Sequence, residues 1–308
     1  MKEDIQQLIS EQLSSWELAK LNYAALGQVR MKSFRIGDHT YRVQFNPARI
    51  LSSAAKVDPN SIKERKCFLC PANLPELQKG IPFGKRYQIL VNPYPIFPRH
   101  LTIPDLSHTD QRISGRFNDM LELAEELDDF VIFYNGPKCG ASAPDHAHFQ
   151  AGNKGFLPIE KEWEATGREK LTTIKGASLW HLNNDPRMAL IIEATEKEAA
   201  NIVFDLVYRS LGSLTEEEEP MMNLVIWKEE TRWVACVFPR KKHRPSCYTA
   251  EGDKNLLISP ASVDMGGVFI TPQERDFEKI TANDITEIIE EVCLSPTDFL
   301  KLKQTIIP

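Results

Sequence analysis

The segment Asn135–Gln150 constrains this chain more than any other part of the sequence. It ends in His146-Ala-His148-Phe-Gln150 and follows Val131–Tyr134, a β-branched and aromatic run typical of a strand. If this end is also extended, the two-residue period places both histidines and the glutamine on one face. The small-residue loop before them lets backbone N–H groups approach a phosphate, and an imidazole beside it could attack phosphorus. A His-x-His pair in a strand can equally be structural, so this segment alone leaves both interpretations open.

The composition is that of an ordinary globular chain, with 308 residues, 42% of them hydrophobic and 26% charged. This length suits one large domain or two halves of about 150 residues each. A net charge of −6 argues against a nucleic-acid partner, because phosphate contacts need a basic surface. No apolar run reaches about 18 residues, which argues against a membrane span. The first residues lack a signal-peptide core, so we expect a cytoplasmic protein whose cysteines are reduced thiols or metal ligands.

Helix and strand patterns mix without a strict strand–helix–strand rhythm, which favours an α+β fold with an antiparallel sheet. Apolar spacing predicts helices over 4–25, 109–129, 195–207 and 281–293, and another beginning at Ser295. Strand patterns cover 41–45, 87–91, 98–104 and 188–193, and a hairpin joins 222–227 to 232–238. We expect the first helix to serve core packing or an oligomer contact, and residues 56–66 and 216–219 to be polar loops.

Cys67 and Cys70 have the spacing of a zinc knuckle, because a two-residue gap lets both sulfurs reach one tetrahedral ion. Such a site needs two more ligands, and His100, His108 and His146 are the nearest candidates in plausible strand geometry. A redox pair has less support, since no thioredoxin-like βαβ pattern surrounds the cysteines. Two buried, inert thiols are the remaining alternative.

Several ordered elements carry a family resemblance. From the N-terminus they are Asn46-Pro47-Ala48-Arg49, Cys67-Phe-Leu-Cys70-Pro-Ala-Asn73, Leu90-Val-Asn92, Pro98-Arg-His100-Leu-Thr-Ile-Pro104, and Asn135 with His146-Ala-His148-Phe-Gln150. Together they resemble the galactose-1-phosphate uridylyltransferase branch of the histidine-triad superfamily, whose relatives include dinucleoside-tetraphosphate phosphorylases and plant GDP-galactose phosphorylases. The resemblance implies a histidine-triad-like antiparallel sheet flanked by helices. The second half matches loosely, as a diverged second unit would.

The resemblance assigns a role to each matched position. His148 would be the nucleophile that accepts a nucleoside monophosphate, and Gln150 would hold a non-bridging phosphate oxygen. Zinc would be held by Cys67, Cys70, His100 and His146, with His108 as the competitor of His100. Substrate contacts would come from Arg49, Asn73, Asn92 and Asn135. Gln150 stands where the hydrolase branch has a third histidine, which favours transfer over hydrolysis.

Three departures from the family pattern leave the base and the sugar open. Pro144-Asp145 stands where the family has Asn-Pro before the first histidine. The family's serine near the β-phosphate falls at Ala143, with Ser142 one residue away. Asn92 is followed by a proline rather than by an acidic residue. Ser142 remains a candidate contact to substrate.

A basic run in the second half is a candidate phosphate or sugar-phosphate clamp. It contains Arg240, Lys242 and His243 directly after a predicted strand, in a chain that is acidic overall. The alternative is a solvated turn.

These observations predict three regions, namely an N-terminal helix at 1–30, a catalytic histidine-triad-like half at 31–155, and a divergent half at 156–308 that completes the substrate site. The resemblance implies a nucleotidylyltransferase that exchanges a nucleoside monophosphate between a nucleoside-diphosphate sugar and a sugar 1-phosphate or inorganic phosphate. The alternatives are a dinucleoside-polyphosphate phosphorylase or hydrolase, and a nucleotide-binding relative without turnover. The resemblance also suggests a homodimer.

Overall fold

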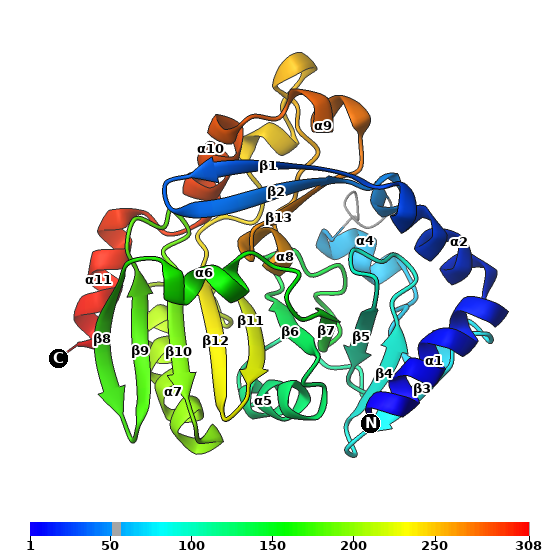
Figure 1. Cartoon of the computed structure of the whole chain (residues 1–308), viewed down its shortest axis with the longest axis horizontal. Helices are drawn as coiled ribbons and strands as arrows, with labels where there is room; N and C mark the ends of the chain where they lie inside the picture. Colours follow the sequence, from blue (N-terminus) through cyan, green and yellow to red (C-terminus); the bar gives the residue numbers. More distant parts are fainter. Residues whose placement is uncertain (51–56, 308) are drawn as a thin grey trace.

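The computed structural model describes residues 1–50 and 57–307, and over these ranges the strands form one ten-stranded sheet and one three-stranded sheet (Figure 1). The large sheet has the order β3 (Gly80–Phe83), β4 (Tyr87–Val91), β5 (His100–Pro104), β7 (His148–Asn153), β6 (Phe130–Asn135), β11 (Met222–Glu229), β12 (Arg232–Pro239), β10 (Leu190–Ala194), β9 (Ala177–Leu182) and β8 (Arg168–Ile174). Its neighbouring strands are antiparallel. The predicted α+β class with an antiparallel sheet is confirmed.

The large sheet is built from two equivalent halves. The first five strands have the order β3-β4-β5-β7-β6, and the last five, taken from the opposite edge, have the order β8-β9-β10-β12-β11. In each half the last two strands exchange places, so the second half repeats the topology of the first. The halves join where β6 pairs with β11, with Asn135 opposite Asn223. The two expected histidine-triad-like units are therefore present, while the boundaries after residues 30 and 155 stay predictions because the sheet continues through both halves.

Each face of the large sheet buries a separate core. One face packs under α1 (Lys2–Ser15), α5 (Phe117–Glu126), α7 (Lys197–Gly212) and α11 (Pro296–Ile306). The other face packs under the small sheet of β1 (Arg30–Ile36), β2 (His39–Phe45) and β13 (Val268–Thr271), with α6 (Ile159–Ala165), α8 (Ser262–Met265), α9 (Glu274–Lys279) and α10 (Ala282–Val292). Remaining helices are α2 (Glu17–Ala25) and α4 (Pro59–Glu64), with short 3-10 turns at Leu26–Gln28, Pro47–Arg49, Pro71–Asn73, Ser246–Tyr248 and Gly252–Lys254. Among the described helices, none is long and apolar enough to cross a membrane.

Several predicted elements differ from the structure. The helix expected over 4–25 is two helices, because Trp16 between them is extended, with φ −113° and ψ 99°. The stretch expected as a polar loop contains α4, which Asp58 caps by accepting a hydrogen bond from the Ser61 N–H; residues 51–56 lie outside the described ranges. The acidic run at 216–219 is only partly solvated, since Glu219 is buried and accepts hydrogen bonds from two tyrosines.

Close packing behind β7 leads to a test of the fold. A Cβ at Gly152 would lie 2.4 Å from the ring of the buried Phe97, so Gly152→Ala should lower the free energy of unfolding by about 1–3 kcal/mol. The matched control is Gly27→Ala, because no heavy atom of the described residues, apart from Gly27 itself and its nearest residues along the chain, lies within 4 Å of that Cβ position. Urea unfolding of both variants measures the difference, and equal stability of the two would contradict this packing.

Candidate active site

A cavity of about 720 Å³ lies on the face of the large sheet that carries the small sheet. Its floor includes Leu90, Thr102, Gln150 and Phe133, which the register aligns across β4, β5, β7 and β6. The second half of the chain contributes walls from α8 and from the loop after β12. A volume of this size suits a ligand as large as a nucleotide.

His148 stands at the start of β7, lines the cavity and is almost fully buried. Its Nδ1 lies 2.7 Å from the carbonyl oxygen of His146. A carbonyl can only accept, so Nδ1 carries the proton and Nε2 keeps its lone pair. Burial lowers the pKa of His148 to about 4, so the imidazole is neutral near pH 7. A neutral ring with a free Nε2 is the form that can act as a nucleophile.

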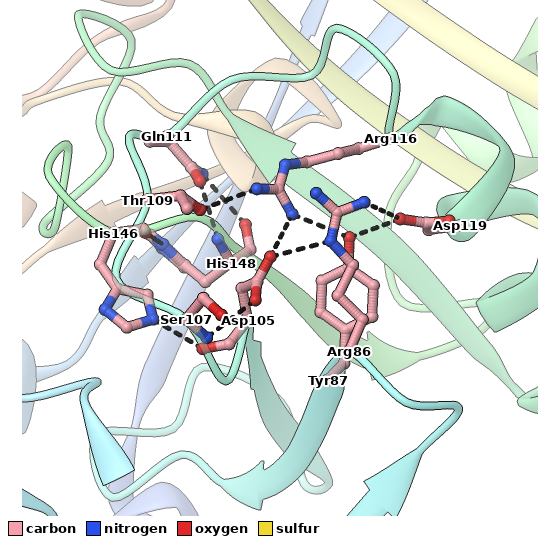
Figure 2. A network of polar contacts seen from close by, with 10 residues as sticks. All are labelled: Arg86, Tyr87, Asp105, Ser107, Thr109, Gln111, Arg116, Asp119, His146 and His148. Carbon is pink, nitrogen blue, oxygen red and sulfur yellow. Dashed lines mark hydrogen bonds and ion pairs between the residues drawn. The ribbon is translucent and has the colours of Figure 1, made fainter. Parts of the chain in front are cut away.

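The backbone of His148 is held by Gln111, a residue that no sequence motif indicated. Pairing between β6 and β7 ends at Phe133 and Gln150, so the strands part just before His148. Gln111 bridges this gap, because its Oε1 accepts from the His148 N–H at 2.8 Å and its Nε2 donates to the His148 carbonyl at 3.0 Å (Figure 2). The same Nε2 also donates to the Asn135 carbonyl at 2.9 Å. The nucleophile candidate is thereby fixed relative to the neighbouring strand.

Gln150 is oriented by a chain of hydrogen bonds through His100. The Ile96 N–H donates to His100 Nδ1 at 3.1 Å, so the proton of this ring lies on Nε2, which donates to Gln150 Oε1 at 3.0 Å. Asn92 also donates to this oxygen, at 3.4 Å. Burial, with the charge of Arg49, lowers the pKa of His100 to about 3, which keeps the ring neutral. With Oε1 engaged, Gln150 offers its NH2 group as a donor to a ligand in the cavity.

Cys67, Cys70, His108 and His146 gather beside the cavity, with one possible ligand atom of each within 4.8 Å of all the others. Cys67 Sγ lies 3.2 Å from His146 Nδ1, and Cys70 Sγ lies 3.2 Å from His108 Nδ1. His146 Nε2 donates to the carbonyl of Asp105 at 2.8 Å, which leaves Nδ1 as the ligand atom. Although burial favours the thiol, the contact with His146 lowers the pKa of Cys67 to about 6. These separations are close to the edges of a tetrahedron around Zn²⁺, so the donor set fits this ion.

His100 does not join this cluster, and the predicted ligand set is corrected in favour of its competitor His108. His100 stands at the start of β5, whereas His108 follows the other end of that strand. An extended strand of five residues separates its ends by more than 10 Å, at roughly 3.3 Å per residue. Only the loop after β5 turns back toward the cysteines. His146 also differs from the prediction, which placed it on the same strand face as His148 and Gln150. Because β7 begins at His148, the two-residue alternation of the strand does not extend back to His146.

The other predicted contact residues divide into two groups. Arg49, Asn92, Asn135, Ser142 and His243 line the cavity. Arg240, Lys242 and Asn73 lie outside its lining and serve local structure. Arg240 is buried and donates to Asn223 at 2.5 Å, Lys242 pairs with Glu291 at the surface, and Asn73 donates to the Cys67 carbonyl at 2.8 Å.

The cavity lining also includes residues that the sequence did not indicate as contacts, among them Trp16, Arg65 and Asp264. Trp16 is part of an apolar helical pattern that is typical of core packing. Arg65 lies in a polar stretch in which no charged residue is distinguished from its neighbours. Arg244 also lines the cavity, and the basic run in the second half did indicate it, because it directly follows the predicted contact His243.

A buried ionic network holds the loop that carries His108 and Gln111 (Figure 2). The Asp105 carboxylate accepts from Arg116 at 2.6 Å and from Arg86 at 2.9 Å. Burial alone would raise the pKa of Asp105, but these two arginines hold it below its ordinary value. Arg116 also donates to Thr109 at 2.8 Å, which ties the start of α5 to the loop.

Removing the buried cation should destabilise the whole protein. Arg116→Met leaves Asp105 with one half-exposed partner, so the free energy of unfolding should fall by roughly 3 kcal/mol. Arg112→Met is the control, because Arg112 makes surface ion pairs only, and its loss should change stability by less than about 1 kcal/mol. Denaturant titration compares the two, and similar losses would show that the buried network does not stabilise the loop as described.

Two family models match the sequence. Residues 8–153 match DUF4922, a domain of unknown function, and residues 162–308 match the domain described as GDPGP1-like, C-terminal. The fold is similar to that of the yeast Ap4A phosphorylase Apa2 in complex with Ap4A, with a TM-score of 0.67 and 15% identity over 95% of this chain and 98% of that chain. The second half of the chain therefore matches a GDPGP1-like domain, and the whole chain has a fold similar to that of the yeast phosphorylase. Both findings agree with the resemblance that the sequence motifs carry.

A second structure of the yeast enzyme gives the same result for the fold. Apa2 in complex with AMP matches with a TM-score of 0.59 and 15% identity, over 92% of this chain and 97% of that chain. At this identity the likeness concerns the fold. No curated protein matches the sequence significantly.

Proposed function

We propose that this protein is a nucleotidyltransferase that works through a nucleotidyl-histidine intermediate on His148. The observation that carries the proposal is the hydrogen bond of 2.7 Å between His148 Nδ1 and the His146 carbonyl, which leaves Nε2 as a lone-pair donor in a cavity of nucleotide size. The donor substrate is a nucleoside-diphosphate sugar. The acceptor is inorganic phosphate or a sugar 1-phosphate.

The proposed exchange has two displacements on phosphorus. In the first, His148 Nε2 forms a bond to the α-phosphorus, and the bond to the bridging oxygen breaks, so that a sugar 1-phosphate leaves with the electron pair. The ring becomes cationic, and its Nδ1–H remains held by the His146 carbonyl. In the second, an acceptor phosphate oxygen attacks the same phosphorus and the histidine leaves as a neutral ring. The product is a nucleoside diphosphate or a new nucleoside-diphosphate sugar.

Gln150 and Asn135 are proposed to stabilise the charge on the transferred phosphate. Gln150 has no ionisable proton, so it contributes hydrogen bonds rather than acid–base chemistry. Asn135 Oδ1 accepts from Asn223 at 3.0 Å and from the Ser262 N–H at 2.8 Å, which directs its NH2 group elsewhere. Arg49 is proposed to stabilise the same charge. Its buried Nε has no hydrogen-bond partner among the described residues, so this N–H can donate to a phosphate oxygen.

Zinc is the proposed ion of the Cys67, Cys70, His108 and His146 cluster. These residues form a closed set of two sulfurs and two nitrogens, which is typical of a structural site. A bound zinc would supply rigidity: it would hold the His146 ring, and the carbonyl of the same residue orients His148. A homodimer remains a proposal from the resemblance, and a cytoplasmic location remains a proposal from the sequence.

A second candidate function is phosphorolysis of a dinucleoside polyphosphate. It is favoured by the fold match to the yeast Ap4A phosphorylase along almost the whole of both chains. The same histidine intermediate would form, with a nucleoside polyphosphate in place of the sugar phosphate as leaving group. A panel of nucleoside-diphosphate sugars and dinucleotides, each with phosphate or a sugar phosphate as acceptor, separates the two.

Trapping the intermediate tests the transfer proposal. Donors labelled at the α-phosphate should label the wild type, and the label should be acid-labile, as a phosphoramidate is. His148→Ala should carry no label and should lose activity by roughly a thousandfold or more. Asn118→Ala, an exposed change on α5, should behave as the wild type. Label that persists in His148→Ala, or is absent from the wild type with every donor, would overturn the proposal.

Metal analysis tests the ion and its ligands separately from activity. Protein purified without chelator should contain about one zinc per chain. His108→Ala should lose most of it, whereas His100→Asn should retain it, because His100 bonds Gln150 and not the cysteines. Circular dichroism confirms that both variants are folded. Retention of zinc in the first variant and loss in the second would restore the original assignment.

A further inference from the structure

Arg65 is a cavity residue that the proposed transfer does not use. It follows α4 and precedes the cysteine pair, and it lines the cavity together with Ser142 and His148. Its Nη2 donates to the Ser142 carbonyl at 3.1 Å and to Asp145 Oδ1 at 3.0 Å. The guanidinium also lies 4.8 Å from the centre of the Phe68 ring. These contacts fix the cation against the loop that leads to His146 and His148.

The guanidinium of Arg65 retains donor capacity toward the cavity. The contacts given above use Nη2, while Nε is buried and has no hydrogen-bond partner among the described residues. A buried N–H without a partner costs free energy unless a ligand satisfies it. A phosphate matches this need, because one of its oxygens can accept a charge-assisted hydrogen bond from the Nε–H of Arg65.

The charge of Asp145 gives a second reason for a cation at this place. Asp145 lies three residues before His148, in the segment between the cavity residues Ser142 and His148. Unbalanced, it would repel an anionic substrate. Arg65 neutralises it through the ion pair of 3.0 Å, and both side chains are largely buried. Ala143, between Ser142 and Asp145, packs in a small apolar cluster with Cys67 and Leu69 and offers no donor of its own.

We propose that Arg65 binds the second phosphate of a nucleoside diphosphate, next to the phosphate that His148 and Gln150 address. The same contact receives the acceptor phosphate in the reverse direction. This assignment rests on the proposed function, since it places the leaving group of the transfer. It makes Arg65 the residue that distinguishes a diphosphate from a monophosphate.

The affinity difference between nucleoside diphosphates and monophosphates tests the proposal. Isothermal titration calorimetry with GDP, ADP and UDP, each against its monophosphate, should show tighter binding of at least one diphosphate to the wild type. In Arg65→Gln the diphosphate should bind about 10- to 100-fold more weakly, as expected for one lost charge-assisted contact, while the monophosphate changes by less than about threefold. Arg65→Lys should be intermediate, because it keeps the charge and loses the Nε–H donor. Arg112→Gln, a surface arginine, is the control.

A double variant separates phosphate binding from simple neutralisation of Asp145. If Arg65 contacts the phosphate, Arg65→Gln with Asp145→Asn should still lack the preference for the diphosphate. A preference restored in the double variant would overturn the proposal, as would one that survives in Arg65→Gln alone. Retained monophosphate affinity shows that each variant is folded. Binding is measured without turnover, so failure of histidine labelling and failure of this preference are distinct results.

Discussion

The site depends on one hydrogen bond between residues two apart in sequence. The carbonyl of His146 accepts from His148 Nδ1 at 2.7 Å and so determines which nitrogen of the ring keeps its lone pair. His146 can offer its carbonyl in this way because its own ring is held on the other side, among the cysteines and against the Asp105 carbonyl. The proposed metal site and the proposed nucleophile thus share one short turn before β7.

The doubled sheet explains why a chain with one His-x-His motif needs its second half. The first half supplies the floor of the cavity and the second half supplies α8 and the loop after β12. Contact between the halves is polar at the site: Asn135 on β6 accepts from Asn223 on β11 and from Ser262 on α8. The divergent half has kept the topology of the repeat while its strands β8 to β10 extend the sheet away from the cavity.

The spacing of the motif residues predicted the strands, and the positions of these residues on them, better than it predicted which distant residues contact them. The two-residue alternation of β7 correctly put His148 and Gln150 on one face, and the cysteine spacing correctly brought both sulfurs together. It did not identify the fourth member of the Cys/His cluster, because His100 and His108 are equally plausible in sequence, and only the turn after β5 decides which one reaches the cysteines. Gln111 and Arg65 could not be found, since neither belongs to a periodic pattern and each acts through a distant backbone or carboxylate.

The sequence by itself determined the class of fold, the order of the strands that carry the motif residues and the chemistry that those residue types allow. These follow from short-range rules, namely the side-chain periods of strands and helices and the spacing of ligands along a turn. Only the tertiary structure decided which residues surround the cavity, which histidine joins the cysteines and which cation meets Asp145. Those choices depend on contacts between residues far apart in the chain, such as Arg65 with Asp145 and Gln111 with His148, whose partners no local pattern specifies.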